Sequence, residues 1–201
     1  MTDEIVQLEW ESFQDVQAMG ERPSCQDDYE TFRIMRSSQF KTWPDALRHS
    51  YRNDLRNAQS TDRNLIYEKY AWMMIETDPL YVMSIRHTLP YLTQSTLNTV
   101  ETIVSQEVLW KKAFNAAYPA LGSRSRVIES REDTADETSF ETYLRGELYT
   151  YSQQTLALYH GFVQECLKNG INLIENTMAE TLQYYGYRTL KEAEKAINGH
   201  E

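Results

Sequence analysis

The stretch Ser139-Phe-Glu-Thr-Tyr-Leu-Arg-Gly-Glu-Leu148 is the basis of the fold we expect, because its beginning has a counterpart in Asp28-Tyr-Glu-Thr-Phe32. A second pair of matching segments, Asn-Leu-Ile, occupies residues 64–66 and 172–174. The first pair lies 111 residues apart (139 − 28) and the second pair 108 residues apart (172 − 64). Because the two spacings differ by so little, the sequence predicts an internal duplication.

Each predicted half contains an opening helix, two helices separated by a break, and a central helix that is apolar on most of its surface. Pro44 makes the break in the first half, and we expect an irregular loop over residues 119–138. The expected helices cover residues 2–19, 28–42, 45–58, 65–77, 97–118, 139–151, 152–169 and 172–185, with a short final helix after residue 189. We therefore predict an all-α, bundle-like single domain over residues 1–201, built from two pseudo-repeated halves at about 1–92 and 93–201.

The charge balance limits the classes of partner. Twenty Lys and Arg residues against 30 Asp and Glu give a net charge of −10, which disfavours binding to the backbone of nucleic acids and to anionic membranes. No apolar stretch is long enough to span a membrane, and the first residues do not resemble a secretion signal. We therefore expect a cytoplasmic protein with no nucleic-acid or membrane partner.

Several short motifs together resemble a known family. They are Ser24-Cys-Gln-Asp-Asp28, Arg63-Asn-Leu65, Glu68-Lys-Tyr-Ala71, Thr138 to Leu148, and Tyr185-Gly-Tyr187. In these motifs the chain resembles a bacterial family catalogued as domain of unknown function forty-one twenty-five, over essentially its whole length. The resemblance implies no activity, cofactor or catalytic residue.

Charged residues at predicted buried positions are the candidates for a functional site. Glu9, Arg36, Glu107 and Arg145 lie on apolar helix faces, where an unpaired charge would cost several kcal/mol. Glu141 lies in the first turn of its helix, where the helix dipole favours a carboxylate. These five residues could form structural ion pairs, or they could line a pocket for an anionic or zwitterionic molecule, with the arginines as forked donors.

Other common chemistries lack their motifs. No His stands three residues after a Glu, as a di-iron helical bundle would require. Cys25 and Cys166 fit no zinc-binding or catalytic spacing, and no glycine-rich phosphate loop is present. We therefore predict no cofactor and no metal site of these kinds; the sequence leaves open a metal site made mainly of carboxylates.

Two functional hypotheses follow. In the first, a small polar or anionic molecule binds in a cleft between the halves, lined by Glu9, Arg36, Glu107, Glu141 and Arg145; a biosynthetic enzyme activity would extend this hypothesis. In the alternative, the chain is a protein-protein interaction or self-association module, for example a homodimer, and the buried charges only fix the helix register. The sequence decides neither the ligand nor the oligomeric state.

Overall fold

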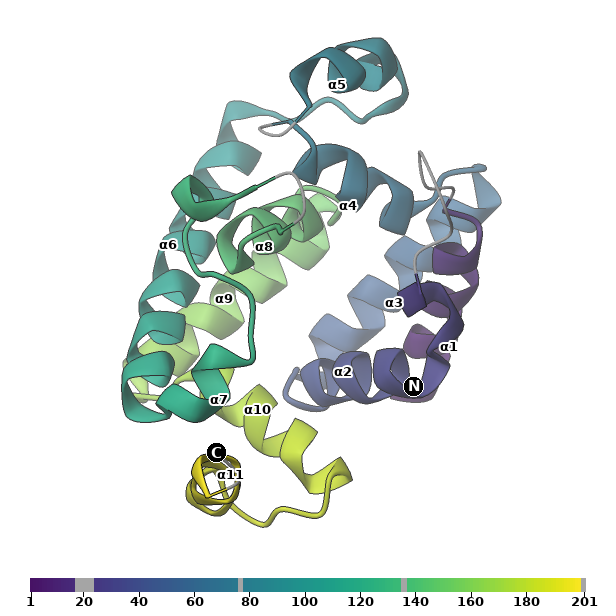
Figure 1. Ribbon diagram of the computed structural model, residues 1–201. Coiled ribbons are helices and arrows are strands. Elements are labelled where there is room, and N and C mark those ends of the chain that lie inside the picture. Colours follow the sequence, from purple (N-terminus) through teal and green to yellow (C-terminus); the bar gives the residue numbers. More distant parts are fainter. Residues whose placement is uncertain (17–23, 76–77, 135–136, 200–201) are drawn as a thin grey trace.

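The computed structural model describes residues 1–16, 24–75, 78–134 and 137–199 (Figure 1). These residues form α-helices and three short 3-10 helices and contain no β-strand, which confirms the predicted all-α fold. The α-helices are α1 (Thr2–Gln14), α2 (Tyr29–Lys41), α3 (Asp45–Ser60), α4 (Leu65–Met73), α5 (Pro79–Ile85), α6 (Gln94–Ala117), α7 (Pro119–Ser123), α8 (Phe140–Leu148), α9 (Gln153–Lys168), α10 (Leu173–Tyr184) and α11 (Leu190–Asn198). The 3-10 helices are η1 (Ser24–Asp27), η2 (Arg86–Thr88) and η3 (Ser130–Glu132).

Side chains cap the helices at both pairs of matching segments. Asp28 accepts a hydrogen bond from the Thr31 amide at the start of α2, and Ser139 accepts one from the Thr142 amide at the start of α8. Asn64 and Asn172 do the same for α4 and α10. The capping residues therefore fix where these four helices begin.

Some predicted boundaries differ from the structure. The expected irregular loop at 119–138 contains α7 and η3, because Pro119 occupies the first turn of α7, where a missing amide proton costs nothing. Helix α6 begins at Gln94, ahead of the predicted start, because the side chain of Thr93 caps it. The predicted ends at residues 19 and 77 lie outside the described residues, and within them α1 ends at Gln14 and α4 at Met73.

The helices pack in corresponding pairs. In the first part of the chain α1 packs on α2 and α3, and in the second part α6 packs on α8 and α9. The central helices cross over: α4 packs on α8, and α10 packs on α2. Helix α3 also packs on α9, and α5 extends from one end of the molecule (Figure 1).

One hydrophobic core joins both parts of the chain. Its fully buried members include Ile5, Phe40, Leu47, Val100, Val104, Leu148 and Val163. Gly146 allows α8 to approach α4 closely, since a Cβ atom at this position would lie 2.9 Å from the carbonyl oxygen of Lys69. No helix of the described residues is long and apolar enough to cross a membrane.

Candidate functional site

The five residues predicted as a site occupy three different places. Glu9 and Arg36 are buried together at the contact between α1 and α2. Glu141 and Arg145 lie on α8 and pair with each other beside a surface pocket. Glu107 is buried on α6 and hydrogen-bonds Tyr159. The structure therefore places the five side chains around α8 and the core, and they do not share one pocket.

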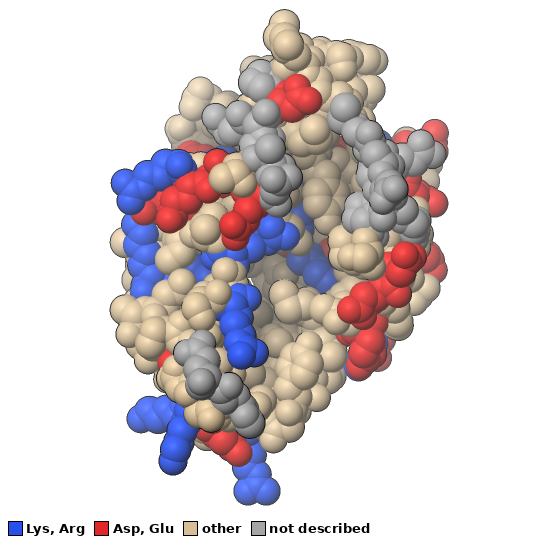
Figure 2. All heavy atoms as spheres, in the orientation of Figure 1, with Lys and Arg blue, Asp and Glu red and all other residues tan. Residues whose placement is uncertain are grey.

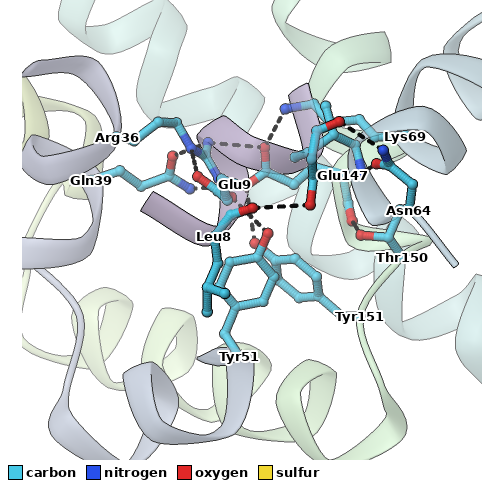
Figure 3. Close-up of polar contacts among 12 residues, drawn as sticks. Leu8, Glu9, Arg36, Gln39, Tyr51, Asn64, Lys69, Glu147, Thr150 and Tyr151 are labelled. Atoms are coloured by element: carbon cyan, nitrogen blue, oxygen red, sulfur yellow. Dashed lines mark hydrogen bonds and ion pairs between the residues drawn. The ribbon is translucent and has the colours of Figure 1, made fainter. Parts of the chain in front are cut away.

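Arg36 is the centre of a buried ion-pair network (Figure 3). Its Nε and Nη2 atoms donate to the two carboxylate oxygens of Glu9 at 2.6 and 2.5 Å. Its Nη1 and Nη2 atoms donate to the two oxygens of Glu147 at 3.2 Å each. One guanidinium thus bridges two carboxylates, one from α1 and one from α8, with the bidentate geometry that favours Arg over Lys.

Four further side chains complete this network, of which Gln39 accepts from Arg36 at 2.7 Å and donates to Glu147 at 3.1 Å. The Nζ atom of Lys69 donates to Glu147 at 2.6 Å, and the hydroxyl of Tyr151 donates to Glu147 at 3.0 Å. The hydroxyl of Tyr51 donates to Glu9 at 2.7 Å. With two carboxylates, one guanidinium and one ammonium, the network is electrically balanced.

The electrostatics keep the Glu147 carboxylate ionised and the Tyr51 hydroxyl protonated. Burial alone would raise the pKa of Glu147, but the charges and hydrogen bonds of Arg36 and Lys69 outweigh burial and hold this pKa well below its usual range. Burial and the charge of Glu9 raise the pKa of Tyr51 far above its usual value, so its hydroxyl stays a donor. We conclude that the network holds α1, α2, α4 and α8 in register, since breaking such a buried pair is costly.

Sequence reasoning missed Lys69 and Glu147. Lys69 lies in a helix that is otherwise almost entirely apolar, and a charge in that position was itself a signal that a buried partner exists. Glu147 lies 111 residues after Arg36, which is the spacing between the two capping residues Asp28 and Ser139. This shared register could have singled out Glu147 as the counterpart of Arg36 in the second half.

A pocket of about 390 Å³ opens where α4, α6, α8 and η3 meet. Its volume lies within the range of small-molecule sites. The lining residues are Trp72, Ile75, Glu101, Ser130, Thr142, Arg145, Gly146 and Tyr149. Trp72 and Tyr149 form an aromatic wall, with ring centroids 5.4 Å apart in an edge-to-face arrangement.

Arg145 is the polar centre of this pocket. Its Nε and Nη2 atoms donate to Glu101 at 2.7 and 3.1 Å, and Nη2 also donates to Glu141 at 2.7 Å. Within the described part of the chain, its Nη1 atom has no hydrogen-bond acceptor. The indole Nε1 of Trp72 is likewise buried without a described partner. Within the described residues, Arg145 Nη1 is therefore the donor left for a ligand, because Trp72 Nε1 is closed off from solvent.

Glu141 has a second role at the same place. Besides Arg145, it accepts a hydrogen bond at 2.8 Å from the backbone amide of Ser130 in η3. Burial raises the pKa of Glu141, but the Ser130 amide and Arg145 outweigh this effect and lower it overall. Glu141 therefore stays ionised and ties η3 to α8 beside the pocket.

Glu107 differs from Glu9 in lacking a cation. The hydroxyl of Tyr159 donates to Glu107 at 2.7 Å, as that of Tyr51 does to Glu9. No basic side chain of the described residues pairs with Glu107, and burial raises its pKa to about 7, although the Tyr159 hydrogen bond partly opposes this. Glu107 is therefore a buried carboxyl that titrates near neutrality.

The described residues contain no group of three or more His, Cys, Asp or Glu side chains arranged to hold a metal ion. Both cysteines are free thiols; Cys25 is exposed and Cys166 is buried.

Comparison with known sequences assigns the chain to a family. The profile of one protein family, described as "Protein of unknown function (DUF4125)", matches residues 1–195. No curated protein and no solved structure matches the chain significantly. The match extends over nearly the whole sequence, including the motifs around α2, α4 and α8, so the chain belongs to the DUF4125 family.

Proposed function

We propose that this protein binds a small zwitterionic molecule in the pocket between α4, α6, α8 and η3. Helix α4 belongs to the first predicted half, and α6 and α8 belong to the second. The proposal thus retains the expected cleft between halves, with Arg145 and Glu141 as ligand-binding residues, and replaces Glu9, Arg36 and Glu107 by the residues that line the pocket.

The charge of the pocket supports a ligand with an amino group. Glu101 and Glu141 contribute two negative charges, while Arg145 contributes one positive charge. With Glu141 beside the lining, a simple anion would meet a net negative charge around the pocket, whereas an ammonium group could bind the exposed carboxylate of Glu101. The lowered pKa of Glu141 suits charge pairing better than proton transfer near neutral pH, which favours binding over acid-base catalysis.

The free donor supports an acceptor group on the same ligand. Nη1 of Arg145 lacks a described partner, and a carboxylate or carbonyl oxygen of the ligand would satisfy it. An aliphatic or aromatic side chain of the ligand would pack on Ile75 and Tyr149. The observation that carries the proposal is the Arg145 guanidinium, which two carboxylates fix on one side and which has no partner among the described residues on the other.

Titration of the protein with amino acids tests the proposal. Isothermal calorimetry with the common amino acids, compared with their amines and their carboxylic acids, should detect binding of at least one amino acid and weaker binding of both analogues. Arg145→Met and Glu101→Gln should each reduce affinity at least tenfold, which is the loss of one charge-assisted hydrogen bond. Arg131→Met is the matched control, since Arg131 pairs with Glu129 and has a side chain that is 79% exposed outside the pocket lining.

The absence of binding by the whole panel, or equal affinity of Arg145→Met and the unmodified protein, would refute the proposal. A biosynthetic reaction of the bound molecule, and the cytoplasmic location expected from the charge and hydropathy, remain predictions.

The predicted duplication is also part of this proposal. Its support is that α1 packs on α3 as α6 packs on α9, and that α4 packs on α8 as α10 packs on α2. The asparagine caps add a second parallel, since Asn64 donates to the carbonyl of Ser12 and Asn172 to that of Trp110. In this view the ligand pocket lies at one of two related helix crossings.

A second candidate function is self-association through the end of the molecule that carries α5. Leu80 and Met83 on α5 are 80% and 74% exposed, and the nearby Tyr91 is 84% exposed. Exposed apolar side chains in one region are typical of interaction surfaces. Sedimentation velocity should then show a dimer that Leu80→Glu converts to a monomer; a monomer at all concentrations of the unmodified protein would exclude this function.

A further inference from the structure

Lys111 is a buried lysine with no carboxylate partner. It lies on α6 with 5% of its surface exposed, and its Nζ atom donates to the hydroxyl of Ser125 at 2.8 Å. Lys69 is equally buried but pairs with Glu147 at 2.6 Å. No acidic side chain of the described residues lies within ion-pair distance of Lys111. The cost of burying its ammonium is therefore not offset as it is at Lys69.

This missing partner favours the neutral amine. Burial lowers the pKa of Lys111 to about 8. Near neutral pH roughly a tenth of such a lysine is uncharged, against less than about one part in a thousand for a lysine with the ordinary value. The uncharged amine is the nucleophilic form.

The surroundings of Lys111 hold the amine in place. The Ser125 hydroxyl accepts from Lys111 and donates to the carbonyl of Gly122 at 2.6 Å, so it is oriented by the turn that follows α7. The amine of Lys111 is therefore held by the turn that follows α7.

The surface next to Ser125 carries several exposed cations. Ser125 is only partly buried, and its neighbours Arg124 and Arg126 are exposed. Lys112 on α6 is also exposed. Figure 2 shows Lys and Arg side chains around a hollow on the face that the segment between α7 and η3 crosses. Such a group of cations raises the local concentration of small anions.

We propose that Lys111 is a covalent site for small carbonyl compounds that carry a negative charge, such as oxo acids. The Nζ lone pair attacks the carbonyl carbon, and the carbonyl oxygen takes up a proton to give a carbinolamine. Loss of one water molecule then gives the carbon-nitrogen double bond of an imine, so the step needs no oxidant or reductant. The Ser125 hydroxyl positions the amine. This site is separate from the zwitterion pocket and does not depend on it.

Reductive trapping tests the proposal on the intact folded protein. Glyoxylate is added with sodium cyanoborohydride, and peptide mapping by mass spectrometry follows the modification of each lysine with time. Lys111 should be modified at least about tenfold faster than Lys112, which follows it on α6 but is exposed and pairs with Glu129 at 2.9 Å. Neutral glycolaldehyde should modify Lys111 more slowly than glyoxylate does, because it gains nothing from the cations.

Two variants separate this site from general lysine reactivity. Lys111→Met should remove the fast modification, and Lys112→Met should keep it. Modification of Lys112 as fast as or faster than that of Lys111 would overturn the proposal. So would a Lys111 that reacts only after unfolding in urea, because its amine would then be inaccessible in the native state.

Discussion

Replacing Gly146 with alanine should destabilise the protein, although the same change stabilises most helices. Alanine is favoured over glycine inside a helix by about 1 kcal/mol, and Gly146 lies inside α8. A Cβ atom there would lie 2.7 Å from Met73 Cγ and 2.9 Å from the backbone oxygen of Lys69. The side chain of Met73 can move aside, but the oxygen belongs to the backbone of α4, so α4 and α8 must separate.

The size of the effect follows from these two opposing contributions. Overpacking of a close contact costs about 1–3 kcal/mol, and separating α4 from α8 also strains the ion pair between Lys69 and Glu147. After subtracting the helix preference of alanine, we expect Gly146→Ala to lower the free energy of unfolding by up to about 2 kcal/mol.

Gly161 provides the matched control. It lies inside α9, and a Cβ atom at this position would meet no atom within 4 Å. Gly161→Ala should therefore raise the free energy of unfolding by up to about 1 kcal/mol. Urea unfolding followed by far-UV circular dichroism measures both variants with the linear extrapolation. If Gly146→Ala stabilised the protein as much as Gly161→Ala, the close approach of α4 and α8 would be refuted.

The remaining predictions concern the core. Arg36→Met should lower the free energy of unfolding by about 3–5 kcal/mol, because Glu9 loses its cation inside the protein; a loss below about 1 kcal/mol in urea titrations would contradict the buried network. Glu107 has a folded-state pKa near 7, above the ordinary 4.5, so its contribution to stability is fully present below pH 4.5 and is lost as the pH rises through 7. The difference of 2.5 between the two pKa values (7 − 4.5) corresponds to roughly 3 kcal/mol in the free energy of unfolding. Glu107→Gln should remove this pH dependence from unfolding curves measured between pH 5 and 8. If the free energy of unfolding of the variant changed with pH as steeply as that of the unmodified protein, Glu107 would not titrate in this range. Asn172→Ala should lower the free energy of unfolding by about 2 kcal/mol, because it removes both a helix cap and a hydrogen bond to the Trp110 carbonyl. An unchanged melting temperature in calorimetry would argue against both contacts.

The sequence predicted the secondary structure well because helix signals are local. Capping residues such as Ser139 and Asn172, the break at Pro44 and the period of apolar residues all act within a few positions. Local signals failed where a short helix follows a proline inside a polar stretch, as in α7, because five residues carry too little periodicity to identify a helix.

The candidate site was only partly predictable. Periodicity placed Glu9 and Arg36 on buried faces, and the structure buries them together. Periodicity gave no means of choosing between residues on opposite sides of α8. Successive side chains of an α-helix are rotated by about 100° around its axis. Arg145 and Glu147 are two residues apart and therefore face nearly opposite directions, one toward the pocket and one toward the core.

By itself, the sequence determined that this chain is helical, where most of the helices begin, and that Glu9 and Arg36 required partners of opposite charge. Only the tertiary structure decided that Glu147 and Lys69 complete the buried network, and that Arg145 keeps a free donor in a pocket. The physical reason is that capping and amphipathicity depend on neighbours in the chain. The pairing of charges on different helices depends instead on how α4 and α8 rotate and approach each other, and Gly146 sets that distance.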